Sequence, residues 1–240
     1  APRPQRRGRS AGPAQPGLPT LIKRKVRHPS KGYLEKRPRT TGREETPMFQ
    51  VRIHGRGGQG VVTGAEMLSV AAFFEDRHAQ AFPSFGSERM GAPVVAFCRI
   101  ADKEIRLREP VLDPDCLIVQ DPTLFKVIDV FAGLRGDGYL LVNTNKTFAE
   151  LHIGQVVERL PKGHAVIVPA TEFALKHVGR PVPNAALLGA FAALTRFVRL
   201  DSVERAIEQA FPGKIGAANI AAAREAHEFV LMQQHAESAA

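Results

Sequence analysis

The chain has 240 residues, of which 44% are apolar, and it carries a formal net charge of +9. This length suits one α/β domain or two small ones, and the apolar content is enough to bury a sizeable core. No run of 18 apolar residues occurs and no secretory signal pattern is found, so we expect neither a membrane span nor a membrane partner. Cys98 and Cys116 lie in apolar runs, which favours buried reduced thiols and a cytoplasmic protein.

The positive charge is concentrated in the first 47 residues. That segment holds 13 Lys/Arg, 3 Asp/Glu and 8 of the 18 prolines, whereas the remainder is nearly neutral, with 20 Lys/Arg and 21 Asp/Glu. Such a composition does not bury enough surface to fold alone. We predict a basic, Pro-rich extended arm over 1–47 and an α/β domain over 48–240. The neutral domain argues against nucleic acid as a partner.

A strand, a glycine turn and a helix are predicted in succession from Met48. Phe49, Val51 and Ile53 alternate with polar residues, as in a strand with one buried face, and a helical apolar pattern runs from Val61 to Phe73. The glycines between them are Gly55, Gly57, Gly58 and Gly60. This is the first half of a βαβ unit, in which the N–H groups at the helix start favour an anion.

The glycine spacing leaves other interpretations open. Gly55-x-Gly57-x-x-Gly60 fits a dinucleotide-binding turn, but that spacing alone is a weak signal. Such a site places an acid at the end of the second strand, and the next apolar run, Ala79–Phe82, has no acid after it until Glu88. An independent NAD- or FAD-binding oxidoreductase is one alternative, and a tight turn without a ligand is another.

A loop over 83–93 follows the second strand, and its polar members are Ser84, Glu88 and Arg89. A surface turn with Glu88 and Arg89 facing water would explain these residues without any function. Val94–Ile100 predicts a buried strand. Asp102 and Lys103 predict a tight turn, after which Glu104–Leu107 would return as the second strand of a hairpin.

The middle of the chain predicts a strand at Leu117–Val119 and a helix from Pro122 to Phe131 that Asp121 caps. A further strand is predicted at Tyr139–Val142. The preceding Gly136-Asp137-Gly138 resembles the opening of a thiamine-diphosphate site, but the asparagines that such a site needs come too soon, so we predict a turn.

The last third is predicted to be mainly helical. After a strand at His164–Val168, helices are predicted from Thr171 to Val178, over 185–197 with Asn184 as cap, over 202–210 after a capping box at Asp201–Glu204, and over 217–233. None of the histidines lies at metal-ligand spacing, so no metal site is predicted in this chain.

Residue identity adds a resemblance to a known family. The motifs are His54–Gly60 (HGRGGQG), Pro83–Val94 (PSFGSERMGAPV), Pro183-Asn184 with Leu188-Gly189-Ala190, and Phe211–Lys214 with Ala218-Asn219. Together they resemble the gamma subunit of the 2-oxoacid:ferredoxin oxidoreductases of the pyruvate synthase type, from Met48 to about Glu228. We expect a doubly wound α/β fold with a mostly parallel sheet, flanking helices and a hairpin.

The resemblance implies a subunit of a thiamine-diphosphate-dependent enzyme. Such an enzyme converts a 2-oxoacid and coenzyme A into an acyl-CoA and carbon dioxide, and passes electrons to ferredoxin or another acceptor. Thiamine diphosphate, magnesium and 4Fe–4S clusters are expected on partner subunits of alpha, beta and delta type, and the arm is expected to strap neighbouring subunits. This chain alone is expected to be inactive. The substrate, pyruvate or an aromatic acid such as phenylglyoxylate, stays open, and a non-catalytic scaffold is the further alternative.

The resemblance also implies which residues form the site. Glu88 and Arg89 are expected to line the shared catalytic pocket. The residues expected to contact coenzyme A, which is a substrate, are Gly55, Arg56, Gly57, Gly58, Gln59, Gly60, Ser84 and Asn184.

Overall fold

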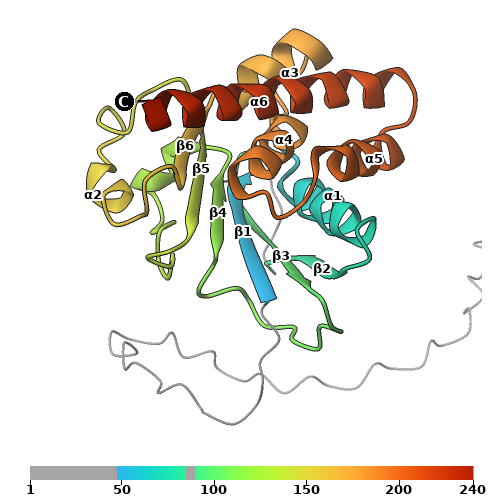
Figure 1. The fold of residues 1–240 in the computed structure, drawn as a ribbon, viewed down its shortest axis with the longest axis horizontal. Helices are drawn as coiled ribbons and strands as arrows, with labels where there is room; N and C mark the ends of the chain where they lie inside the picture. Colours follow the sequence, from blue (N-terminus) through green and yellow to red (C-terminus); the bar gives the residue numbers. More distant parts are fainter. Residues whose placement is uncertain (1–47, 85–89, 240) are drawn as a thin grey trace, which may run out of the picture. The chain divides into compact units, whose positions relative to one another are not determined.

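The computed structural model describes residues 48–84 and 90–239 (Figure 1). The strands are β1 (Met48–Arg56), β2 (His78–Pro83), β3 (Pro93–Ala101), β4 (Cys116–Val119), β5 (Tyr139–Asn143) and β6 (Ala165–Val168). The helices are α1 (Val61–Phe73), the 3-10 helix η1 (Pro122–Lys126), α2 (Gly154–Val157), α3 (Ala170–Val178), α4 (Asn184–Thr195), α5 (Leu200–Ala210) and α6 (Lys214–Ala239). The predicted arm, 1–47, lies outside the described residues.

The described strands form one six-stranded sheet in the order β2-β3-β1-β4-β5-β6. β1, β4, β5 and β6 are parallel neighbours, whereas β3 lies antiparallel between β1 and β2. The predicted α/β fold with a mostly parallel sheet is therefore confirmed. The parallel arrangement brings the carboxyl ends of β1, β4, β5 and β6 to one edge of the sheet.

Alternating residues of the strands bury two faces of the sheet. On one face, Val51 and Ile53 of β1 belong to a large apolar cluster that also takes residues from α1, α4, α5 and α6 (Figure 1). On the other face, Leu117 and Val119 of β4 pack with Leu124 of η1 and with the segments around α2. β4 and β5 are buried on both faces, which explains their nearly continuous apolar runs.

α4 lies in the middle of the helical layer and is buried on all sides, as its sequence predicts. Gly189 of α4 lies against the backbone of Ala223 in α6, so close that an added Cβ would overlap the main chain. This approach explains a glycine in the middle of a helix, where it otherwise weakens the helix. No helix among the described residues is long and apolar enough to cross a membrane.

The prediction of a hairpin over 94–107 is wrong. β3 ends at Ala101 and Glu104–Leu107 form no strand. Instead β3 pairs with β2 on one side and with β1 on the other, so the antiparallel hairpin of this fold is β2–β3. The Arg99 side chain of β3 donates to Gln50 Oε1 at 3.1 Å, directly across in β1. This pair gives a hydrogen bond to two polar side chains that interrupt apolar strands.

Several helix boundaries also differ from the predictions. α3 starts one residue earlier than predicted, α4 ends at Thr195 and not at 197, and α6 spans Lys214–Ala239 in place of 217–233. The helix expected from Pro122 to Phe131 is the 3-10 helix η1, which ends at Lys126, although Asp121 does cap it by accepting from Thr123 N. The predicted capping box at Asp201–Glu204 does not form. α5 starts earlier, at Leu200, after an extended Arg199 that provides no side-chain cap.

Candidate functional site

The glycine turn, Gly55–Gly60, joins the carboxyl end of β1 to α1. In open α/β sheets ligands bind outside the carboxyl ends of the parallel strands. The neighbouring strand β4 ends beside this turn, since Gln120 N donates to His54 O at 2.7 Å. The turn and the residues that follow β4 therefore form one surface at the edge of the sheet.

Two positions of the turn adopt backbone conformations that favour glycine. Gly58 has φ +92° and Gly60 has φ +71°, both in the left-handed region. Space is also limited. A Cβ on Gly58 would lie 2.8 Å from the Cε of Met90, and a Cβ on Gly60 would lie 2.5 Å from Nδ2 of Asn184. A larger residue at either position would have to displace its neighbour as well as strain the backbone.

The first turn of α1 offers N–H groups to an anion. Gly60 caps the helix without any side-chain hydrogen bond, and the first turn contains no acid. The first N–H groups of a helix have no intrahelical acceptor, and the helix dipole adds partial positive charge there. Gly58, two residues before the cap, is exposed. These features favour a negatively charged group near this end of α1.

Asn184 connects α4 to the glycine turn. It was predicted to cap a helix starting at residue 185, but it is the first residue of α4 itself. Its side chain is buried, donates from Nδ2 to Gly60 O at 3.3 Å and accepts from Ala185 N at 2.9 Å. The structure therefore places Asn184 behind the turn, where it supports Gly60.

Arg56 and Gln59 link the turn to the residues after β4. Arg56 Nε lies 3.0 Å from Asp121 Oδ2, and Arg56 Nη2 donates to Thr123 Oγ1 at 2.8 Å. Gln59 Nε2 donates to the same Asp121 oxygen at 3.1 Å, and its Oε1 accepts from Arg56 N at 2.8 Å. Arg56 Nη1 also donates to Gly91 O at 2.9 Å. One arginine thus joins three segments that are distant in sequence.

The Asp121 carboxylate is ionised at neutral pH. Partial burial raises its pKa, but hydrogen bonds from Thr123 and Gln59 and the charge of Arg56 outweigh burial, so the net pKa lies below its usual value. From the sequence, Asp121 is predicted only to cap a helix, and no role is predicted for Thr123. The available signal was the position of Asp121 at the carboxyl end of a buried parallel strand.

Two further predicted site residues, Ser84 and Gly57, contact β3 or the segment just before it. Ser84 follows β2, and its backbone N donates to Val95 O of β3 at 2.8 Å. Gly57 donates from its N to Ala92 O at 2.9 Å and accepts from Gly91 N at 3.1 Å, which fixes the turn against the start of β3. The expected pocket residues Glu88 and Arg89 lie outside the described residues.

Asn143, the last residue of β5, is a further polar residue at the same edge. Its Nδ2 donates to Gln120 O at 2.7 Å and to Thr171 Oγ1 at 2.8 Å, and its Oδ1 accepts from Thr171 N at 3.0 Å. Because these bonds fasten β4, β5 and the start of α3 together, Asn143 supports the edge on which the glycine turn lies.

His54 is buried just before the turn. It is 5% exposed, and neither ring nitrogen has a hydrogen-bond partner within the described residues. Burial, with a smaller contribution from the charge of Arg52, lowers the pKa of His54 to about 4. The imidazole is therefore neutral at pH 7 and does not act as a cation beside the turn.

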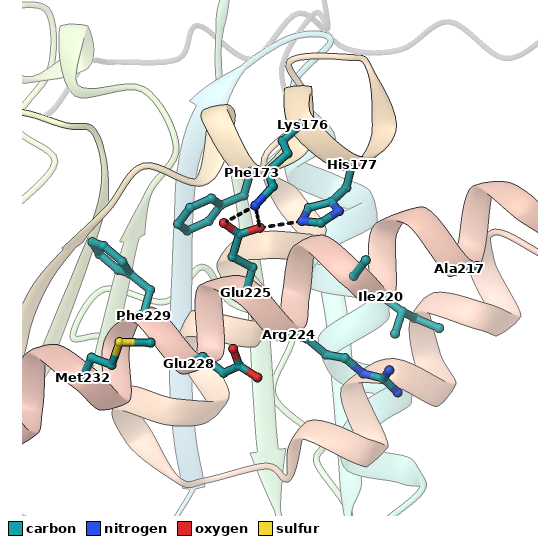
Figure 2. A pocket seen from close by; sticks show the side chains of 11 residues that line it. Phe173, Lys176, His177, Ala217, Ile220, Arg224, Glu225, Glu228, Phe229 and Met232 are labelled. Carbon is teal, nitrogen blue, oxygen red and sulfur yellow. Dashed lines mark hydrogen bonds and ion pairs between the residues drawn. The ribbon is translucent and has the colours of Figure 1, made fainter.

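A separate hollow of about 580 Å³ lies between α3 and α6, and none of the described site residues lines it (Figure 2). Lys176 Nζ donates to both carboxylate oxygens of Glu225 at 2.9 Å, and His177 Nε2 lies 2.5 Å from Glu225 Oε2. These groups satisfy one another across the two helices. The trio links α3 to α6 and leaves little charge for a ligand.

Comparison with known proteins gives consistent matches over the described part of the chain. A family model described as pyruvate ferredoxin/flavodoxin oxidoreductase matches residues 50–229. The pyruvate/ketoisovalerate oxidoreductases common subunit gamma of Pyrococcus abyssi is 49% identical over 181 residues, which cover 75% of this chain and 96% of that protein. Pyruvate synthase subunit PorC of Methanothermobacter marburgensis is 49% identical over 181 residues, covering 75% of this chain and 97% of that protein.

Solved structures agree with the sequence matches. The crystal structure of pyruvate oxidoreductase subunit PORC from Thermotoga maritima superimposes with a TM-score of 0.63 at 38% sequence identity. The superposition covers 75% of this chain and 96% of that chain.

Proposed function

Because the chain belongs to the pyruvate ferredoxin/flavodoxin oxidoreductase family, we propose that its glycine turn completes the coenzyme A site of a 2-oxoacid oxidoreductase. The chain is a gamma subunit of the pyruvate/2-oxoacid:ferredoxin oxidoreductase type. In the proposed reaction the carboxylate of a 2-oxoacid leaves as carbon dioxide, and the acyl group forms a thioester with coenzyme A. The electrons pass to ferredoxin or another acceptor.

In this proposal the cofactors are held by alpha-, beta- and delta-type partners. Cys98 and Cys116 are both buried in strands, and an iron–sulfur cluster needs about four thiolates. Asp137, in the sequence that resembles a thiamine-site opening, forms a 3.0 Å ion pair with Arg135 at the start of β5, at the opposite edge of the sheet from the glycine turn. These residues do not fit a resident cluster or a metal–diphosphate, so we assign this chain no step through those groups.

The open amino end of α1 is the observation that supports the proposal. Coenzyme A carries a diphosphate and a further phosphate, and such groups bind well to N–H groups at the start of a helix. The exposed Gly58 lets the backbone approach a ligand without an intervening side chain. The turn and α1 would hold the anionic part of coenzyme A while partner subunits hold the reacting centre.

The test is the coenzyme A dependence of the assembled enzyme. Valine at position 58 would strain a φ of +92° and press on Met90, so Gly58→Val is expected to lower kcat/KM for coenzyme A by about tenfold or more. Gly154→Ala, whose Cβ would meet nothing within 4 Å, serves as control. An unchanged kcat/KM in a correctly assembled Gly58→Val enzyme would overturn the proposal. The isolated chain is expected to show no turnover.

An independent dinucleotide-binding enzyme receives less support from the topology. In a dinucleotide-binding fold the acid that binds the ribose ends the strand next to β1. Here the strands next to β1 are β3, which is antiparallel, and β4, which Asp121 follows. Asp121 is already bound by Arg56, Gln59 and Thr123. β2, which β3 separates from β1, ends with Phe82 and Pro83. Titration with NADH or FAD distinguishes the two proposals, since micromolar binding by the folded chain would favour the dinucleotide site. A scaffold role predicts that Gly58→Val alters assembly and leaves turnover per assembled enzyme unchanged.

The 2-oxoacid substrate is proposed to be pyruvate or a related acid. An aromatic acid such as phenylglyoxylate is the alternative substrate. The Pyrococcus abyssi relative carries both pyruvate and ketoisovalerate in its name. We assign substrate choice to partner subunits. Turnover of the assembled enzyme with a panel of 2-oxoacids would identify the substrate.

A further inference from the structure

Asp121 binds the glycine turn with one carboxylate oxygen and η1 with the other. Oδ2 accepts from Arg56 Nε at 3.0 Å and from Gln59 Nε2 at 3.1 Å. Oδ1 accepts from Thr123 N at 3.0 Å and from Thr123 Oγ1 at 2.5 Å. The Asp121 side chain is only 15% exposed. A single carboxylate therefore fastens the turn after β1 to the segment after β4.

The hydrogen bonds of this network occupy the guanidinium of Arg56, which could otherwise bind a ligand phosphate. Each of Nε, Nη1 and Nη2 of Arg56 donates a hydrogen bond inside the chain, to Asp121, Gly91 and Thr123. The Asp121 charge also neutralises that of Arg56 at 3.0 Å. Arg56 is thus better suited to hold segments together than to supply net charge to an anion.

We propose that Asp121 is a positioning residue, which acts through Arg56 and Gln59 to hold the glycine turn in the shape that binds coenzyme A. The proposal rests on the proposed function of that turn. Glycine populates many backbone conformations, so a turn with Gly57, Gly58 and Gly60 needs external contacts to keep one of them. Arg56 and Gln59 flank Gly57 and Gly58, and Gln59 directly precedes Gly60. Both side chains donate to Asp121 Oδ2.

The role of Arg56 decides whether Asp121→Asn raises or lowers the KM for coenzyme A. If Arg56 bound a coenzyme A phosphate directly, loss of the Asp121 charge would free the guanidinium and lower the KM for coenzyme A. If Asp121 positions the turn, the amide can no longer accept from both Arg56 and Gln59 while also accepting from Thr123. The turn then loses its anchor and the KM rises.

Steady-state kinetics of the assembled enzyme test this proposal. With saturating 2-oxoacid and acceptor, Asp121→Asn is expected to raise the KM for coenzyme A about tenfold and to change kcat by less than about twofold. Thr123→Val, which removes the hydroxyl between Arg56 and Asp121, should raise KM in the same direction. Thr123→Ser, which keeps the hydroxyl, should have the same KM for coenzyme A as the wild type.

Asp137→Asn is the matched control. Asp137 makes an ion pair with Arg135 Nε of the same 3.0 Å length, but its side chain is 70% exposed. It precedes β5, whereas Asp121 follows β4, so the two carboxylates lie at opposite edges of the sheet. The variant removes the same charge from the same chain, and its KM for coenzyme A is expected to equal that of the wild type.

The outcomes separate the two proposals. An unchanged or lowered KM in Asp121→Asn, or a Thr123→Val enzyme that matches Thr123→Ser, would overturn the positioning role. If Gly58→Val still raised the KM in that case, the proposed function of the turn would stand without Asp121. If Asp121→Asn fails to assemble, the Thr123 pair alone decides, because a purely structural effect would lower kcat by loss of active enzyme and leave KM unchanged.

Discussion

At the scale of single residues, His54 combines deep burial with an imidazole that has no hydrogen-bond partner among the described residues. Its pKa falls from the ordinary 6.5 to about 4 because burial disfavours the charged ring. Between these two values the unfolded chain binds a proton that the folded chain does not. Titration of His54 therefore leaves the free energy of unfolding unaffected above pH 6.5 and lowers it progressively as the pH falls toward 4.

The His54 effect can be isolated by comparing pH dependences. The wild-type chain is expected to lose about 1–2 kcal/mol of unfolding free energy through His54 between pH 7.5 and pH 5.5. His54→Leu cannot titrate, so its loss over the same interval should be smaller by that amount. Urea unfolding of both proteins at the two pH values measures the difference, in which other titrating groups cancel. Equal losses in both proteins would show that His54 titrates normally.

The candidate site was only partly predictable at this scale. Gly58 and Gly60 were identified from local sequence because a strand, clustered glycines and a helix occur in immediate succession. Asp121 and Thr123 were not, because their role depends on the parallel pairing of β1 with β4, which brings residues 65 positions apart into contact. The sequence shows an acid after a strand, and a helix cap explains that pattern equally well.

At the scale of elements, the contact between α4 and α6 depends on Gly189. A Cβ at this position would overlap the backbone of Ala223. Gly189→Ala is therefore expected to destabilise the chain by about 1–3 kcal/mol, even though alanine favours helices, because the two helices would have to separate. Thermal or urea unfolding measures the effect.

Gly154→Ala provides the comparison for this substitution. Gly154 begins α2, and an added Cβ would meet nothing within 4 Å. The expected change in unfolding free energy is between zero and about 1 kcal/mol of stabilisation. If Gly189→Ala were as stable as Gly154→Ala, the close packing of α4 on α6 would not be what holds the helical layer together.

Helices and strands were predictable where one local sequence pattern dominates. They were not predictable where a residue distant in sequence determines the strand pairing. α1 and the buried α4 follow from their apolar patterns. β3 was assigned the wrong partner because an apolar strand followed by Asp102 and Lys103 resembles half of a hairpin, whereas the stable pairing aligns Arg99 with Gln50 of β1. The predicted capping box failed because α5 begins one residue before Asp201.

At the scale of the whole molecule, the described residues form a platform that presents the glycine turn at one edge of its sheet. The turn is tied to β3 through Gly57, to α4 through Asn184 and to β4 through Arg56. Three elements that are distant in sequence thus fix one short segment. This arrangement suits a subunit that contributes a rigid binding edge to a site completed by other chains.

Hydrogen exchange in the assembled enzyme tests most directly whether that edge binds coenzyme A. Within the described residues the N–H groups of Gly58 and Gly60 donate to no acceptor, and those of the first turn of α1 have no intrahelical one. Saturating coenzyme A is expected to slow exchange in a peptide covering residues 55–63 and to leave the amides of α6 unchanged. Unaltered exchange over 55–63 with coenzyme A fully bound, or the same slowing throughout the chain, would contradict binding by the glycine turn.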